Sequence, residues 1–114
     1  MTFSNSLFLG CLFVGIAFLL MGNLLRIFPP KKVNRWYGYR TSSSMRSQER
    51  WDFAQIIAAK EMIKQGFLLT LFGIFTGFFF HFDEMTNVIL IVSLVLVSSI
   101  AMIYFTERAL KKNF

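Results

Sequence analysis

Residues 7–25 read LFLGCLFVGIAFLLMGNLL, a run of nineteen residues without a charged side chain. As an α-helix, such a run extends about 28 Å, which matches the hydrocarbon thickness of a bilayer. Two further uncharged runs follow, GFLLTLFGIFTGFFF at residues 66–80 and VILIVSLVLVSSIAMIYF at residues 88–105. None of them alternates apolar and polar residues as the strands of a transmembrane barrel do. The sequence therefore predicts an all-α membrane protein, a bundle of three transmembrane helices.

The composition of the whole chain fits a single membrane domain over residues 1–114. Hydrophobic residues make up 55% and charged residues 16%, whereas soluble domains average about a quarter charged residues. We expect spans at about 7–27, 66–82 and 88–105, with a polar-aromatic cap over about 29–64. The leader before the first run lacks basic residues, so we expect a retained helix and not a cleaved signal peptide.

The basic residues are clustered along the chain, and their positions predict an orientation. Nine of the twelve Lys and Arg residues lie between Arg26 and Lys64, and the other three lie in the C-terminal tail. The turn at residues 81–87, HFDEMTN, contains none. By the positive-inside rule, the cap and the C-terminus are cytoplasmic and the N-terminus lies outside. This distribution indicates the lipid bilayer as partner and argues against nucleic acid.

The second helix is expected to be long. Pro29 and Pro30 end the first helix, and Ser47 or Ser44 supplies an N-cap for the next. No breaker follows until His81, so the helix runs from near Gln48 into the second span. Stepping at about 100° per residue separates two faces of its first half. The charged face, expected to be solvated, has Glu49, Arg50, Lys60, Glu61 and Lys64; the face expected to contact protein has Trp51, Gln55, Ala58, Ala59, Met62 and Gly66.

Small residues mark places where the helices can approach closely. Gly73 and Gly77 form a G-x-x-x-G pattern on the second helix, and Gly15 and Gly22 lie with Cys11 on one face of the first. Packing within one bundle and contact between two copies of the chain both explain such patterns. The sequence therefore leaves a homo-oligomer open.

The run PPKKVNRWYGYRTSSSMRSQERWDFAQ, residues 29–55, resembles the signature of the SdpI immunity-protein family of bacterial membrane proteins. The matching elements are an asparagine, a Gly-x-Arg-Thr segment and a tryptophan after a polar run. Here they are Asn34, Gly38, Arg40, Thr41 and Trp51. Two positions depart from the family pattern. Gln55 stands where His or Asn is usual, and Ala59 where glycine is usual.

The resemblance implies a function of toxin immunity or signalling. The founding member protects its producer against a membrane-active killing-factor peptide, and it relays the toxin's presence by holding a cytoplasmic repressor at the membrane. The implied partners are therefore a peptide toxin and a repressor. A function of another class is kept as the alternative: a small envelope enzyme or lipid-handling factor that binds phosphate headgroups through Arg40.

Arg40 is the residue of the cap whose chemistry is most distinctive. A guanidinium near the interface is costly unless it is paired, and it offers five donors to acceptors. We expect Arg40 either to hold the loop by bonding Asn34 or helix-end carbonyls, or to receive a lipid phosphate or a peptide carboxylate. Trp51 and Gln55, one helical turn apart, are expected to contact the 34–41 turn and complete a polar-aromatic cluster.

Enzyme chemistry finds little support in the sequence. Neither a Gly-rich phosphate loop nor a nucleophile elbow is present. His81 lies near two acidic residues but has no second histidine or cysteine cluster for a metal. We therefore expect a protein that is not an enzyme, with no cofactor and no metal.

Overall fold

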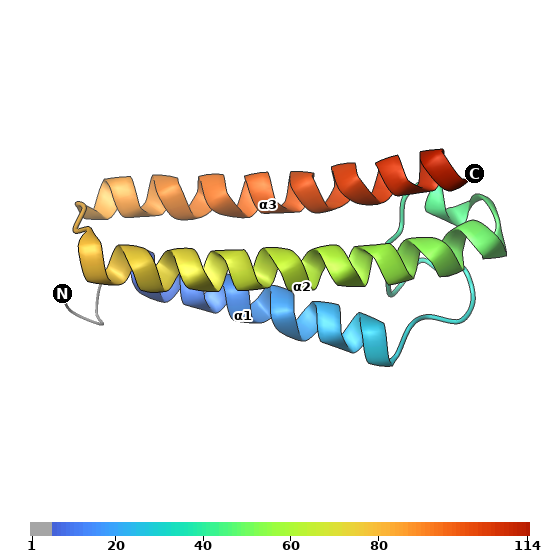
Figure 1. Cartoon of the computed structure of the whole chain (residues 1–114), viewed down its shortest axis with the longest axis horizontal. Coiled ribbons are helices and arrows are strands. Elements are labelled where there is room, and N and C mark those ends of the chain that lie inside the picture. The colour runs from blue at the N-terminus through green and yellow to red at the C-terminus, as the bar shows by residue number, and fades with distance from the viewer. Residues whose placement is uncertain (1–5) are drawn as a thin grey trace.

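The computed structural model describes residues 6–114, which form three long helices and one short 3-10 turn (Figure 1). The helices are α1 (Ser6–Ile27), α2 (Gln48–Phe79) and α3 (Glu84–Asn113), and the short turn is η1 (Ser44–Arg46). Each long helix is long and apolar enough to cross a membrane. The predicted all-α fold with three spans is confirmed. The predicted position of the N-terminus concerns residues 1–5, which lie outside the described residues.

The ends of α1 and α2 follow the local chemistry of the chain. Pro29 and Pro30 come directly after α1, where a proline cannot continue the helix. Ser47 is the N-cap of α2, and its hydroxyl accepts a hydrogen bond from the Arg50 amide at 3.1 Å. The prediction of Ser47 as the N-cap of the second helix is confirmed. The 32-residue α2 continues without interruption to Phe79.

Helix α3 continues well beyond its apolar run. It ends at Asn113, so the basic residues that we expected in a C-terminal tail are helical instead. Lys111 and Lys112 lie in its last turn, where positive charge is favourable because the helix dipole is negative at that end. This extension brings the end of α3 beside residues 28–47, the segment between α1 and α2 that we call the cap (Figure 1).

The two glycine-bearing faces meet each other between α1 and α2. A Cβ on Gly15 would lie 3.0 Å from the carbonyl oxygen of Gly66, and a Cβ on Gly22 would lie 2.8 Å from the Ile63 side chain. Gly73 lies against the Cβ of Cys11, and Gly77 lies against Phe8. These four glycines therefore permit close packing of α1 on α2 within one molecule.

Helix α3 runs beside α2 and packs on it less extensively than α1 does (Figure 1). At the end away from the cap, the Ser6 hydroxyl donates to the Glu84 carboxylate at 2.9 Å. Asn87 donates in turn to the Ser6 hydroxyl at 3.0 Å. These bonds fasten α3 to the start of α1, while its outer face carries exposed apolar residues suited to lipid.

Candidate functional site

Gln55 holds the backbone of the cap. Its amide nitrogen donates to the Tyr39 carbonyl at 2.9 Å, and its amide oxygen accepts from the Tyr39 N–H at 2.6 Å. Gln55 is 1% exposed, so both of its polar groups are satisfied by one residue of the loop. Gly38 comes just before this contact with a φ of 103°. A Cβ there would also lie 2.7 Å from the Gln55 amide oxygen, which is why the position needs glycine.

Trp51 fixes the beginning of the same loop. It is fully buried, and its indole nitrogen donates to the Pro30 carbonyl at 2.8 Å. Gln55 contacts the 34–41 turn as the sequence predicted, whereas the indole hydrogen bond of Trp51 goes to Pro30, before that turn. Two residues one turn apart on α2 therefore anchor the cap at two separate points.

Asn34 organises the first part of the loop by itself. Its side-chain oxygen accepts from the N–H groups of Trp36 and Tyr37, each at 2.9 Å, and its amide nitrogen donates to the Lys32 carbonyl at 2.9 Å. This is the turn that an asparagine side chain can make with the backbone that follows it. The Tyr37 hydroxyl then donates to the carbonyl of Phe28 at 2.8 Å, so a tyrosine satisfies an acceptor at the end of α1.

Arg40 has a different hydrogen-bond partner from those that the sequence predicted. Its guanidinium donates to the carbonyl of Arg35, and not to Asn34 or to the helix-end carbonyls. Arg40 is exposed and lines a shallow hollow of about 380 Å³ with Arg35 and Met45. The carbonyls of Leu24 and Phe28 at the end of α1 accept from the Tyr37 hydroxyl instead. Its predicted role toward a ligand stays a prediction.

Glu107 is the residue of this site that the sequence analysis missed. Its carboxylate accepts hydrogen bonds from the hydroxyls of Tyr39, Thr41 and Ser43, at 2.8, 3.1 and 2.5 Å. Glu107 thereby ties α3 to the cap. It is the single acidic residue after the third apolar run, in a chain whose cap is rich in hydroxyls, and that combination was the available indication.

Tyr39 lies at the centre of the cap and is 5% exposed. Burial, followed by the hydrogen bond and negative charge of Glu107, raises the pKa of the Tyr39 phenol above its ordinary value. The phenol is therefore a neutral donor to Glu107. The buried hydroxyl of Ser44 donates to the Tyr39 carbonyl at 3.1 Å. Tyr39 is therefore held by side chains from η1, α2 and α3.

Arg50, in the first turn of α2, binds the cap, whereas the sequence placed it only on the solvated charged face. Its Nε donates to the Ser43 carbonyl at 2.7 Å, and its guanidinium lies 5.4 Å from the centre of the Phe114 ring. Phe114 in turn meets the edge of Phe53. The last residue of the chain and the first turns of α2 are therefore joined.

The polar groups of the cap divide into buried ones that are paired and exposed ones. Within residues 6–114, no three His, Cys, Asp or Glu side chains gather as a metal site would need. The buried polar groups are paired within the protein: Gln55 bonds to Tyr39 and Trp51 to Pro30. The Tyr39 hydroxyl bonds to Glu107 on α3. The exposed side chains of the cap include Arg40 and Trp36, and Trp36 is 89% exposed. The cap therefore presents cationic and aromatic groups on a backbone held in place from α2 and α3.

Comparison with known proteins adds two findings. The model of the SdpI/YfhL protein family matches residues 31–105. The Bacillus subtilis (strain 168) protein described as the uncharacterized protein YfhL is 31% identical over 94 residues, which cover 82% of this chain and 78% of that protein. No solved structure gives a significant match. The family match includes nearly all of the cap, the whole of α2 and the apolar part of α3.

Proposed function

Because the chain belongs to the SdpI/YfhL family of membrane proteins, we propose that it protects a bacterial membrane against a membrane-active killing-factor peptide. The resemblance to SdpI immunity proteins suggests this role. The observation that supports it in this chain is the anchored cap, whose backbone is fixed by Gln55 while Arg40 and Trp36 remain exposed.

A fixed loop is useful for binding because less conformational entropy is lost when a partner arrives. Arg40 offers a planar guanidinium suited to a carboxylate. Trp36, four residues earlier, offers a large aromatic surface of the kind enriched in binding hot spots. A membrane-active peptide combines apolar side chains with a terminal carboxylate, so it matches this pair of groups.

The same surface also suits the signalling role that the family resemblance implies. With the orientation predicted from the basic residues, the cap faces the cytoplasm. A peptide bound there and a cytoplasmic repressor would then meet the same exposed side chains. Signalling to a repressor is thus part of this proposal, and it depends on the cytoplasmic position of the cap.

The test is survival of a sensitive bacterium that expresses the chain and is challenged with the killing-factor peptide. We expect protection by the unchanged protein and its loss in Arg40→Gln. Arg40→Lys should lose most of it as well, because one ammonium cannot reproduce the two parallel hydrogen bonds of a guanidinium with a carboxylate. All variants are compared at equal abundance in the membrane.

Arg46→Gln is the matched control, since it removes the same charge from the same loop. Arg46 is also exposed, and within residues 6–114 its side chain makes no hydrogen bond or ion pair. Full protection by Arg40→Lys would show that positive charge suffices. Absence of protection by the unchanged protein, when it is abundant in the membrane, would contradict the proposed function.

A further inference from the structure

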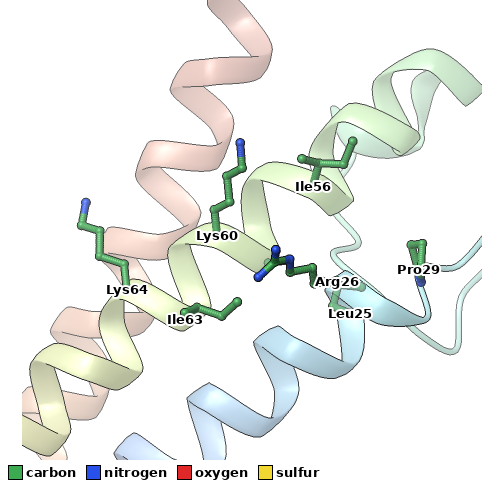
Figure 2. Close-up of a pocket in the computed structure, with 8 residues that line it drawn as sticks. Leu25, Arg26, Pro29, Ile56, Lys60, Ile63 and Lys64 are labelled. Carbon is green, nitrogen blue, oxygen red and sulfur yellow. The ribbon is translucent and has the colours of Figure 1, made fainter.

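A groove with an apolar lining and a basic rim lies between the end of α1 and α2, apart from the side chains that hold the cap. Its volume is about 450 Å³. The apolar part is formed by Leu25 and Pro29 at the end of α1 and by Ile56, Ala59 and Ile63 on α2. The basic part is formed by Arg26, Lys60 and Lys64. Figure 2 shows Arg26 extending from α1 towards α2, while the side chains of Lys60 and Lys64 extend from α2 away from Arg26.

The position of the groove is at the boundary between the apolar and polar parts of the bundle. Arg26 comes directly after the first uncharged run, which ends at Leu25. On α2, Lys64 comes two residues before the second run, which begins at Gly66. The groove therefore lies at the level where phospholipid headgroups meet the acyl chains, in the leaflet at the cap end of the molecule.

The positive charge of the groove is largely uncompensated. Within the part of the chain that the structure describes, neither Arg26 nor Lys60 forms a hydrogen bond or an ion pair. Lys64 lies 3.4 Å from the Glu61 carboxylate and 4.8 Å from the centre of the Phe105 ring. One carboxylate thus stands against three cations. Cationic side chains at the edge of a bilayer are stabilised when they meet an anion.

From this combination we infer that the groove binds an anionic phospholipid, with the phosphate on Arg26 and Lys60 and an acyl chain along Leu25, Ile56 and Ile63. A guanidinium and an ammonium are both suited to phosphate oxygens. Long lysine side chains can turn towards such a group while their methylene stems stay on apolar surface. The inference goes beyond the proposed peptide protection and does not rest on it. It concerns the groove between α1 and α2, whereas the proposed protection concerns the exposed side chains of Arg40 and Trp36.

The shared chemistry of the ligand is an anionic phosphate group. A zwitterionic lipid carries this phosphate together with a cationic headgroup, which the basic rim disfavours, and the apolar lining distinguishes a lipid from a soluble phosphate ester. A free phosphate ester would gain nothing from Leu25, Ile56 and Ile63. A phospholipid gains from burying hydrocarbon against them. The groove should therefore hold an anionic lipid in preference both to a zwitterionic lipid and to a soluble phosphate ester.

The experiment is lipid retention by the purified full-length protein, measured by native mass spectrometry after titration with phosphatidylglycerol or phosphatidylcholine. We expect one phosphatidylglycerol to be retained at a roughly tenfold lower concentration than phosphatidylcholine, as expected for an anion that meets several cations. An excess of glycerol phosphate should not displace it. Replacing Arg26, Lys60 and Lys64 together by Gln should abolish the preference.

The matched control replaces Lys31, Lys32 and Arg108 by Gln. These residues carry the same three charges, are exposed and lie outside the groove. The control protein should keep the preference for phosphatidylglycerol. If both triple variants lose the preference equally, the attraction is a general effect of net charge and the inference is wrong. Retention of the preference by the groove variant would overturn it as well.

Two further measurements keep the test decisive. Helix content by circular dichroism shows whether the groove variant folds, and if it does not, Lys60→Gln alone is used, because Lys60 is exposed and its replacement leaves the packing in place. That variant should lose part of the preference. The killing-factor peptide is also added to the protein with bound lipid. If the protein shows no preference among lipids and the peptide displaces them only when Arg26, Lys60 and Lys64 are present, the groove binds the peptide and the lipid assignment is wrong.

Discussion

At the scale of single residues, Gln55 shows why an amide suits its position in α2. The position must supply one donor and one acceptor to the N–H and carbonyl of a single residue, Tyr39. A carboxylate would lack the donor and an aliphatic side chain would lack both. Because the site is buried, water cannot replace the missing partner, and an unpaired buried group costs free energy.

Replacing Gln55 by Ala should lower the free energy of unfolding by roughly 1 to 3 kcal/mol, since it leaves the buried Tyr39 N–H without its acceptor and removes one of the two donors to the Tyr39 carbonyl. Gln55→His and Gln55→Asn, the residue types usual in the family pattern, should cost less because each keeps polar atoms in the site. The measurement is thermal stability in detergent. Lys60→Ala is the control, since Lys60 is exposed on the same helix. Equal losses for Lys60→Ala and Gln55→Ala would contradict the structural role of Gln55.

At the scale of helices, Trp51 joins α2 to the end of α1. The side chain is fully buried, and its indole nitrogen donates to the carbonyl of Pro30, shortly after the end of α1. Trp51→Ala should reduce the free energy of unfolding by roughly 3 kcal/mol or more, as removal of large aromatic side chains from packed sites does. Trp36→Ala provides the comparison, because Trp36 is 89% exposed and should be nearly neutral in stability. Thermal unfolding in detergent measures both.

Trp51→Phe separates the hydrogen bond from the packing. This variant keeps most of the ring and loses the donor to Pro30, so it should cost roughly 1 to 3 kcal/mol for the unpaired carbonyl. If Trp36→Ala destabilises the protein as much as Trp51→Ala, the burial of Trp51 does not anchor the cap.

Helix α3 is joined to the cap mainly by one carboxylate. Glu107→Ala would remove an acceptor from three hydroxyls, among them the buried phenol of Tyr39, whose other acceptor, the Ile103 carbonyl, lies at 3.4 Å. We expect a loss of roughly 1 to 3 kcal/mol in unfolding free energy and faster amide hydrogen exchange over residues 39–44. Glu61→Ala is the control, because its ion pair with the exposed Lys64 should contribute only about 0 to 1 kcal/mol. Unchanged exchange in Glu107→Ala would show that the cap holds without α3.

At the scale of the whole molecule, the sequence predicted what depends on local pattern. The three spans, the start of α2 at Ser47 and the buried face with Trp51 and Gln55 all follow from hydropathy, capping and helical periodicity, which act over a few residues. The partners of the cap depend on contacts across the fold. Tyr39 and Glu107 are separated by 68 residues, and no local pattern pairs them.

Arg40 and the end of α3 illustrate the same limit. The carbonyl at the end of α1 that we expected to accept from Arg40 accepts from the Tyr37 hydroxyl instead. This pairing depends on the path of the loop in the folded protein. The helical conformation of residues 106–113 was missed because their charges resemble a tail in sequence. The contact of Glu107 with the cap stabilises that part of α3 in the folded protein.

The orientation of the bundle in the membrane is a property of the whole molecule, and it follows from the distribution of charge. The cap and the end of α3 lie together and are basic, while the turn between α2 and α3 lies at the other end with Asp83 and Glu84. The positive-inside rule predicts that the cap end faces the cytoplasm. Single cysteines are therefore introduced at Ser42 and at Met85, both exposed, in a Cys11→Ala background. Ser42 is preferred to Ser43, whose hydroxyl bonds to Glu107.

An impermeant thiol reagent applied to intact cells should label the cysteine at Met85 and should not label that at Ser42. After the cells are permeabilised, both positions should react, which shows that the cysteine at Ser42 is accessible. Labelling at Ser42 in intact cells would place the cap outside. A cytoplasmic repressor could then no longer reach Arg40 and Trp36, although an external peptide still could. Labelling at Ser42 would therefore exclude the signalling part of the proposed function and leave the protective part in place.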